Sequence, residues 1–245
     1  MKFVIANWKM NGDLALVREF VEGIKDIPSD RKIIICPPAA LITLFDTSTS
    51  FNVSCNKEKA FSIGAQNCFY EKAGAFTGEN SPALLKAIGC EYVILGHSER
   101  RAIFNELDEI VFKKWNAAVS QNLTPILCIG ETANQRTNWK DVLSKQLSNY
   151  REKNSKDSFD LHGTIFAYEP VWSIGTGKVP STEEIGEVVN FVKNALGSSS
   201  RNYYVVYGGS VNGNNAASIL NINGLDGVLV GSASLKLDEF KKIMI

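Results

Sequence analysis

A carboxylate, an imidazole and an ammonium group occur at corresponding places in this sequence. Glu169, His97 and Lys9 each stand within two residues of the end of a short apolar run. A positioned carboxylate or imidazole can act as a general acid or base, and an ammonium group can hold an anion. Glycine-containing turns follow two further runs, at Gly208, Gly209 and Ser210 and at Gly231 and Ser232.

Each of these signals is weak when it is taken alone. The sequence has two histidines, His97 and His162, and a single histidine is more often structural than catalytic. Lys9 alone is typical of a surface lysine. Glu169 precedes a proline, which favours a turn residue. The prediction of a site depends on their shared position after the apolar runs, because a random scatter would put some of them before the runs.

The segment that follows Glu169 could be a phosphate-binding nucleotide loop, because it contains Gly-Thr-Gly-Lys. Such a loop requires a second glycine five positions before the Gly-Lys pair and a hydroxyl residue after it. Here Trp172 stands five positions before Gly177, and Val179 follows Lys178. The sequence therefore does not match a nucleotide loop.

A mobile lid is the better interpretation of this segment. Pro170 stiffens one end, whereas Gly175 and Gly177 free the other. Trp172 and Ile174 supply apolar groups that could exclude water when the lid closes over a reactive intermediate.

The elements that must position these residues recur along the whole chain. Apolar runs occur at residues 2–7, 33–36, 61–65, 92–96, 125–129, 164–168, 203–207 and 227–230. They are apolar almost throughout, which is typical of strands buried on both faces in a parallel sheet. Helical patterns lie between several of them, at residues 13–26, 106–118, 141–150 and 181–192. Asp13 is a candidate N-cap, and Ser181 with Glu184 fits a capping box.

Eight strand-plus-helix units favour an α/β fold closed as a (β/α)8 barrel, in which chemistry collects where the strands end. An open doubly wound sheet is the alternative. It should carry a glycine fingerprint in the first strand–helix turn. That turn, residues 7–12, contains only Gly12.

Composition limits the possible functions. The 245 residues suit one domain, and equal numbers of acidic and basic residues (26 each) give no overall field that favours nucleic acid or an anionic membrane. The apolar runs are too short for a membrane helix or a secretory signal. The cysteines are odd in number and lack a C-x-x-C pattern, so we expect free thiols in a cytoplasmic protein, with no metal site. They are Cys36, Cys55, Cys68, Cys90 and Cys128.

Four longer motifs resemble the triosephosphate isomerase family. They are residues 7–12 (NWKMNG), 96–101 (GHSERR), 168–178 (YEPVWSIGTGK) and 207–211 (YGGSV). The resemblance covers essentially the full chain. It implies a TIM barrel that forms a single domain over residues 1–245. It also implies the interconversion of dihydroxyacetone phosphate and D-glyceraldehyde 3-phosphate through an enediolate, with no cofactor and no metal.

The resemblance also implies a role for each site residue. Glu169 matches the general base, and His97 matches a neutral electrophile that polarises the carbonyl group. Lys9 and Asn7 match the groups that bind the substrate and stabilise the enediolate, and Glu99 matches the partner that fixes Lys9. The expected backbone donors to the phosphate are Gly175, Ser210, Gly231 and Ser232. The expected lid consists of Pro170, Val171, Trp172, Ser173, Ile174, Gly175, Thr176, Gly177 and Lys178.

Three positions depart from the family pattern. Ser173 stands where alanine is usual, and we expect little effect at what looks like a surface position. Ser232 replaces a glycine, so a positive φ there would strain the backbone and weaken phosphate binding. Asn105 stands where glycine is common, and we expect it to alter only a turn.

Residues 69–80 form a long loop after the third predicted strand. By resemblance it is an arm that inserts into a partner subunit, which implies a homodimer. The expected interface residues are Phe76, Thr77, Gly78 and Glu79.

Two other functions remain open from the residues alone. A Schiff-base aldolase would also use a barrel, a lysine and a phosphate site. A non-catalytic phosphosugar-binding barrel would bind triose phosphates and leave them unchanged.

Overall fold

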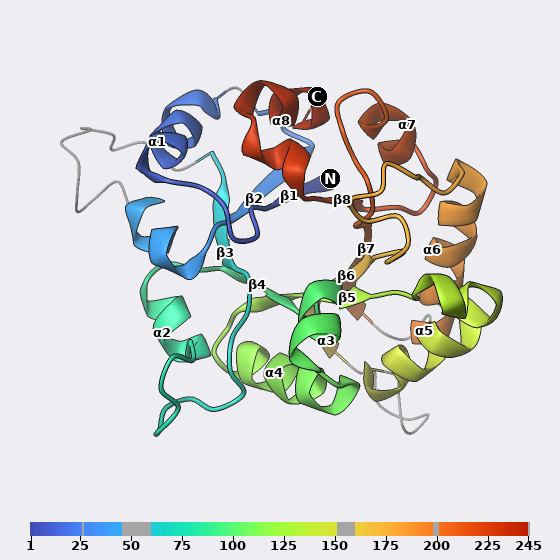
Figure 1. Ribbon diagram of the computed structural model, residues 1–245, viewed down its shortest axis with the longest axis horizontal. Helices are drawn as coiled ribbons and strands as arrows, with labels where there is room; N and C mark the ends of the chain where they lie inside the picture. The colour runs from blue at the N-terminus through green and yellow to red at the C-terminus, as the bar shows by residue number, and fades with distance from the viewer. Residues whose placement is uncertain (26, 46–59, 151–159, 198–200, 245) are drawn as a thin grey trace.

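Eight parallel strands close into a barrel in chain order, and β1 pairs with both β2 and β8 (Figure 1). The computed structural model describes residues 1–25, 27–45, 60–150, 160–197 and 201–244. The strands are β1 (Lys2–Asn7), β2 (Arg31–Cys36), β3 (Ser62–Ala65), β4 (Tyr92–Leu95), β5 (Thr124–Ile129), β6 (Asp160–Tyr168), β7 (Arg201–Tyr207) and β8 (Gly227–Val230). The predicted (β/α)8 barrel is therefore confirmed over the open sheet.

Helices surround the barrel on all sides (Figure 1). The α-helices are α1 (Leu14–Gly23), α2 (Pro82–Ala87), α3 (Ser98–Phe104), α4 (Asp108–Ser120), α5 (Trp139–Leu147), α6 (Thr182–Leu196), α7 (Ala216–Leu220) and α8 (Leu237–Met244). Short 3-10 helices add η1 (Ala39–Phe45), η2 (Ala133–Asn138), η3 (Ser148–Tyr150) and η4 (Ser232–Leu235).

The strands are apolar throughout because each one buries both of its faces. One set of side chains fills the barrel interior, including Phe3, Ile5 and Ile94. The alternate set, including Val4 and Val93, packs with the helices in a second core. This two-sided burial is what the continuous apolar runs predicted. The strand bounds agree with the predicted ones to within two residues, except for β6. That strand begins four residues early, in a polar segment with an irregular register.

The predicted helix signals are also found. The Asp13 carboxylate accepts a hydrogen bond from the Leu16 N–H at 2.8 Å and caps α1, whereas the predicted end of this helix, Asp26, lies outside the described residues. Ser181 and Glu184 form the capping box of α6, with reciprocal bonds of 3.2 and 2.8 Å. This box fixes the point at which the chain leaves the lid segment and enters α6.

The four cysteines that the structure describes, Cys36, Cys68, Cys90 and Cys128, are free and buried, as predicted; Cys55 lies outside the described residues. Burial raises the pKa of the Cys68 thiol to about 12, so it stays protonated near neutral pH. Within the described ranges, the helices are all too short or too polar to span a bilayer.

We predict that Ser181→Ala lowers the free energy of unfolding by about 1 kcal/mol, because it removes the N-cap acceptor of α6. Urea unfolding at fixed protein concentration measures the change. Ser148→Ala is the matched control. It removes a hydroxyl that donates only to the Lys145 carbonyl near an exposed helix end, so it should change stability by less than about 0.5 kcal/mol. Equal stability of the two variants would contradict the capping role.

Candidate active site

The predicted site residues gather at the carboxyl ends of the strands, around one cavity of about 560 Å³. Asn7 ends β1, His97 follows β4 and Glu169 follows β6, so three separate parts of the barrel supply them. Residues from the predicted set that line this cavity are Asn7, Lys9, His97, Glu169, Ile174, Gly175, Gly177, Ser210, Gly231 and Ser232. The shared position of these residues after the apolar runs therefore corresponds to a shared place in space.

A backbone hydrogen bond orients the imidazole of His97. His97 is the N-cap residue of α3, and its Nδ1 accepts from the Glu99 N–H at 3.2 Å. A nitrogen that accepts a hydrogen bond carries no proton, so the proton belongs on Nε2. Nε2 lies 3.1 Å from Glu169 Oε1. The imidazole therefore presents an N–H to the cavity.

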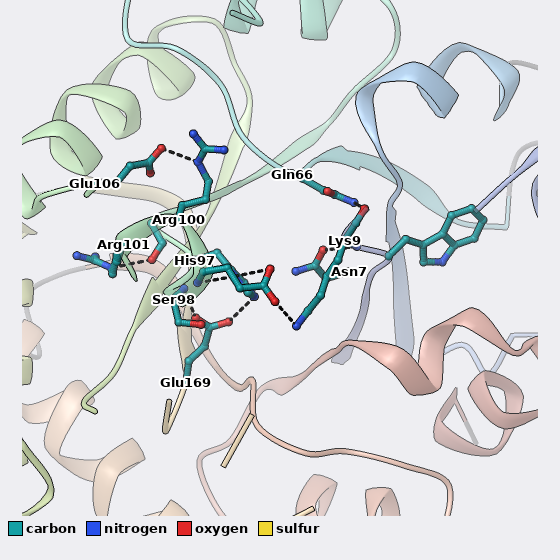
Figure 2. A network of polar contacts seen from close by, with 12 residues as sticks. Asn7, Lys9, Gln66, His97, Ser98, Arg100, Arg101, Glu106 and Glu169 are labelled. Atoms are coloured by element: carbon teal, nitrogen blue, oxygen red, sulfur yellow. Dashed lines mark hydrogen bonds and ion pairs between the residues drawn. The ribbon is translucent and has the colours of Figure 1, made fainter. Parts of the chain in front are cut away.

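Glu169 is almost completely buried, with 2% of its side chain exposed. Its Oε2 accepts from the Ser98 N–H at 3.0 Å, while its Oε1 faces His97 (Figure 2). One backbone donor and a neighbouring imidazole thus orient a carboxylate that has little contact with water. Such a carboxylate is positioned to accept a proton from a ligand in the cavity.

Lys9 adopts a left-handed backbone conformation, with φ of 52°. Asn7 Oδ1 accepts from its N–H at 3.0 Å, and Gln66 Nε2 donates to its carbonyl at 2.8 Å. Its Nζ forms an ion pair with Glu99 Oε1 at 2.5 Å. These contacts hold the strained backbone and direct the ammonium group toward His97.

The position of Glu169 is set by the close approach of the chain after β6 to the end of β5. Its N–H donates to the Ile129 carbonyl at 2.7 Å, and a Cβ at Gly130 would lie 1.8 Å from its carbonyl oxygen. Only glycine fits there without displacing Glu169. Cys128 is buried on the interior side of the same strand. Burial raises the pKa of its thiol well above the ordinary value, and the nearby Glu169 carboxylate raises it further.

The predicted phosphate-binding turns lie beside Lys9. A Cβ at Gly231 would lie 3.6 Å from Lys9 Cε, so the ammonium group and this turn share one end of the cavity. The expectation of strain at Ser232 is wrong, because Ser232 is not among the described residues with a positive φ. It begins η4 in an ordinary conformation, so strain gives no reason for weak phosphate binding here.

The comparisons with known proteins agree with this geometry. A family model described as triosephosphate isomerase matches residues 2–245. A triosephosphate isomerase of Francisella tularensis subsp. mediasiatica (strain FSC147) is 40% identical over 251 residues, which cover 99% of this chain and 96% of that relative.

The chain belongs to the triosephosphate isomerase family.

The lid of this triosephosphate isomerase family member is attached at its first end by a buried carboxylate. Glu131 is fully buried, and its Oε1 accepts from the Trp172 Nε1–H at 2.9 Å and from the Tyr168 hydroxyl at 3.1 Å. The Val171 N–H donates to its carbonyl at 3.0 Å. Gly175 and the residues up to Val179 are exposed. The expected lid segment is therefore held by Glu131 at its first end, and its exposed residues lie toward the other end.

The sequence predicts a surface position for Ser173, but this residue is fully buried. Its hydroxyl donates to the Lys178 carbonyl at 2.5 Å and lies 3.4 Å from the Tyr207 hydroxyl. The polarity of serine suggested exposure, but two partners satisfy the hydroxyl in the interior.

Asn105 occupies the left-handed C-cap of α3, with φ of 53°. This explains why glycine is common there, and asparagine tolerates the same conformation. Asn105 therefore ends α3 in the left-handed conformation and does not alter a turn.

Sequence reasoning missed three residues that support the site, namely Gln66, Ser98 and Glu131. Gln66 directly follows β3 and Glu131 comes two residues after β5, so the strand-end argument could have found both. Ser98 contributes through its backbone N–H, which leaves no signal in residue type.

We predict that Gln66→Ala raises the KM for triose phosphate about tenfold and changes kcat less. The substitution removes a donor that holds the left-handed Lys9, at a cost of roughly 1–1.5 kcal/mol. Steady-state kinetics measure the effect. Gln121→Ala, whose side chain bonds only locally on the surface, should match the unaltered protein. An unchanged KM in Gln66→Ala would show that Lys9 holds its conformation without Gln66.

Proposed function

We propose that this protein interconverts dihydroxyacetone phosphate and D-glyceraldehyde 3-phosphate, with Glu169 as the base. The observation that carries the proposal is the 3.1 Å contact between Glu169 Oε1 and His97 Nε2, in a cavity also lined by Lys9 and Asn7. Triosephosphate isomerases are a standard example of such a pairing between a carboxylate base and a neutral histidine.

The substrate carbonyl would accept a hydrogen bond from the His97 Nε2–H, between His97 and Glu169. With the substrate carbonyl on His97, the Glu169 carboxylate is free to take a proton from the neighbouring carbon, which leaves an enediolate. His97 then moves a proton between the two oxygens, and Glu169 returns its proton to the other carbon. Atoms and charge balance, because each proton that is removed is returned to the same molecule.

Charge development decides where the donors are needed. The enediolate carries its negative charge on oxygen, and donors that are fixed before the reaction stabilise such charge more than mobile water does. Lys9 and Asn7 would supply two of these donors next to His97. The phosphate would lie against the N–H groups of Gly175, Ser210, Gly231 and Ser232, at the end of the cavity near Lys9.

The lid, residues 170–178, would close over this cavity during turnover. Its apolar residue Ile174 lines the cavity already. Closure excludes water, which strengthens the electrostatic contacts and protects the enediolate from losing phosphate. The lid motion of this family is itself a standard example of gating.

We also propose that the protein is a homodimer. Large apolar side chains are exposed on segments that follow β1, β3 and β4, namely Met10 (94%), Phe76 (41%), Leu84 (66%), Ile103 (68%) and Phe104 (62%). Several large apolar side chains exposed on neighbouring barrel loops are consistent with an interaction site. The occupant would be a second copy of this chain, contacted by Phe76, Thr77, Gly78 and Glu79.

The arm of residues 69–80 has its own internal support. It projects at the lower left of Figure 1, and the Phe69 N–H donates to the Asn80 carbonyl at 2.8 Å across its base. The rings of Phe69 and Phe76 lie 4.6 Å apart. An arm ordered before contact loses less entropy on binding.

Two further assignments belong to the same proposal. A cytoplasmic location suits the free thiols, because oxidising compartments favour disulfides. Residues 1–245 would act as a single domain, since the site draws on segments from β1 to η4.

We predict that Glu169→Gln lowers kcat by about 10²–10⁴ while binding of the inhibitor 2-phosphoglycolate is retained. A coupled assay with a triose phosphate dehydrogenase measures isomerisation. Glu183→Gln, an exposed carboxylate at the start of α6, is the control and should be fully active. Near-normal turnover of Glu169→Gln would falsify the assignment of the base.

The same preparation separates the alternative functions. An aldolase would be trapped covalently by substrate and borohydride, and a binding protein would bind triose phosphate without isomerising it. Either result for the unaltered protein would contradict the proposed function.

We predict that Phe76→Asp gives a monomer with at least tenfold lower kcat/KM. The buried charge opposes association, and the loops of the site lose the support of the partner. Sedimentation velocity measures the assembly. Leu14→Asp on α1, outside the proposed interface and 49% exposed, should remain a dimer. A monomeric unaltered protein with full activity would refute the homodimer.

A further inference from the structure

The hydrogen bonds of the lid converge on one residue, Ser173. Its N–H donates to the Pro170 carbonyl at 2.7 Å. Its carbonyl accepts from the Ser210 hydroxyl at 2.7 Å and from the Thr176 hydroxyl at 3.1 Å. Its own hydroxyl donates to the Lys178 carbonyl at 2.5 Å. Backbone groups at any residue could make the first three contacts, but the fourth requires a hydroxyl.

That fourth contact joins the two sides of the lid. Residues 173 and 178 are the two ends of the exposed tip, which consists of residues 174–177. A side-chain bond between these ends closes the tip into a ring, in the way that a bond across the neck closes a compact loop.

Apart from the Thr176 hydroxyl, which donates to the Trp172 carbonyl and accepts from the Lys178 N–H, both at 3.2 Å, the tip has little side-chain packing. No atom of the described chain would lie within 4 Å of a Cβ built at Gly175 or Gly177, and both glycines have a positive φ, of 70° and 75°. Packing therefore does not hold these residues in place. Glycine is also the residue with the most conformational freedom to lose when a loop becomes ordered.

Tyr207 and the close backbone of Gly209 fix the position of the Ser173 hydroxyl. It lies 3.4 Å from the Tyr207 hydroxyl, and both lie over Gly209, where a Cβ would approach Tyr207 Oη to 2.1 Å and Ser173 Oγ to 3.1 Å. Ser173 and Tyr207 are fully buried, so water does not compete for these contacts.

From this geometry we infer that Ser173 is a positioning residue. Its hydrogen bond to the Lys178 carbonyl, called the clasp below, joins the two ends of the lid tip and holds the phosphate-binding tip in a preformed turn. The inference rests on the proposed function, because it concerns the lid of the same site. Both partners of this bond belong to the protein, so the bond lowers the entropy that the tip loses when Gly175 binds a phosphate.

Loss of the clasp should affect only substrates that the tip holds. D-Glyceraldehyde lacks the phosphate, so its slow isomerisation depends on the base and the imidazole alone. A general structural defect would slow both substrates equally. The ratio of the two rates therefore separates a positioning role from a structural one.

The experiment compares Ser173→Ala with the unaltered protein. We expect kcat/KM for D-glyceraldehyde 3-phosphate to fall about fivefold, mainly through KM, as for the loss of one ordinary hydrogen bond. The rate with D-glyceraldehyde should not change. The fraction of substrate lost as methylglyoxal should rise, because a loose tip holds the phosphate less rigidly. Ser148→Ala, which removes a remote hydroxyl, should change none of these quantities.

Hydrogen exchange of the amides of residues 174–178 tests the clasp by a measurement that does not depend on enzyme activity. Exchange in the free protein should be faster in Ser173→Ala, and saturating inorganic phosphate should reduce the difference. If the unaltered protein does not isomerise triose phosphates, the proposed function fails while this measurement still decides on the clasp. Equal exchange in the two proteins, or equal loss of rate with both aldehydes, would overturn the inference.

Discussion

The pairing of β1 with both β2 and β8 is the constraint on which the rest of this molecule depends. It closes a parallel sheet, and in a closed parallel sheet all strands end at the same rim. Residues that are 72 to 160 positions apart in the sequence, namely Lys9, His97 and Glu169, therefore meet around one cavity. The same closure buries both faces of every strand, which explains why the strands carry little polarity except at their ends.

At that rim a single backbone group decides the chemistry of the imidazole. His97 lies between two carboxylates, with Glu99 Oε2 3.6 Å from Nδ1 and Glu169 Oε1 3.1 Å from Nε2. The Glu99 N–H donates to Nδ1 at 3.2 Å and so fixes which ring nitrogen faces Glu169. The start of α3 adds the positive end of a short helix. Lys9 compensates Glu99 at 2.5 Å, which leaves Glu169 as the carboxylate that faces the imidazole directly.

The sequence predicted the strands well because two-sided burial leaves continuous apolar runs, and all eight appear in the structure. Helices such as α3 (Ser98–Phe104) were not predicted, since seven residues are too few to show a helical period. Directly acting residues were found from their types and places, with the resemblance supplying their roles. The burial of Ser173 depends on partners distant in the sequence, among them Tyr207, and polarity alone misled there.

The contact at Gly130 has a consequence for altering this rim. The catalytic arrangement there depends on an absent side chain, since a single added carbon would overlap the Glu169 carbonyl. Attempts to reshape the pocket by enlarging residues at the junction of β5 and β6 would therefore move the peptide unit of Glu169 before they reached any ligand. The start of the turn after β8 is less constrained, because a Cβ at Gly231 would lie at an ordinary contact distance of 3.6 Å from Lys9 Cε.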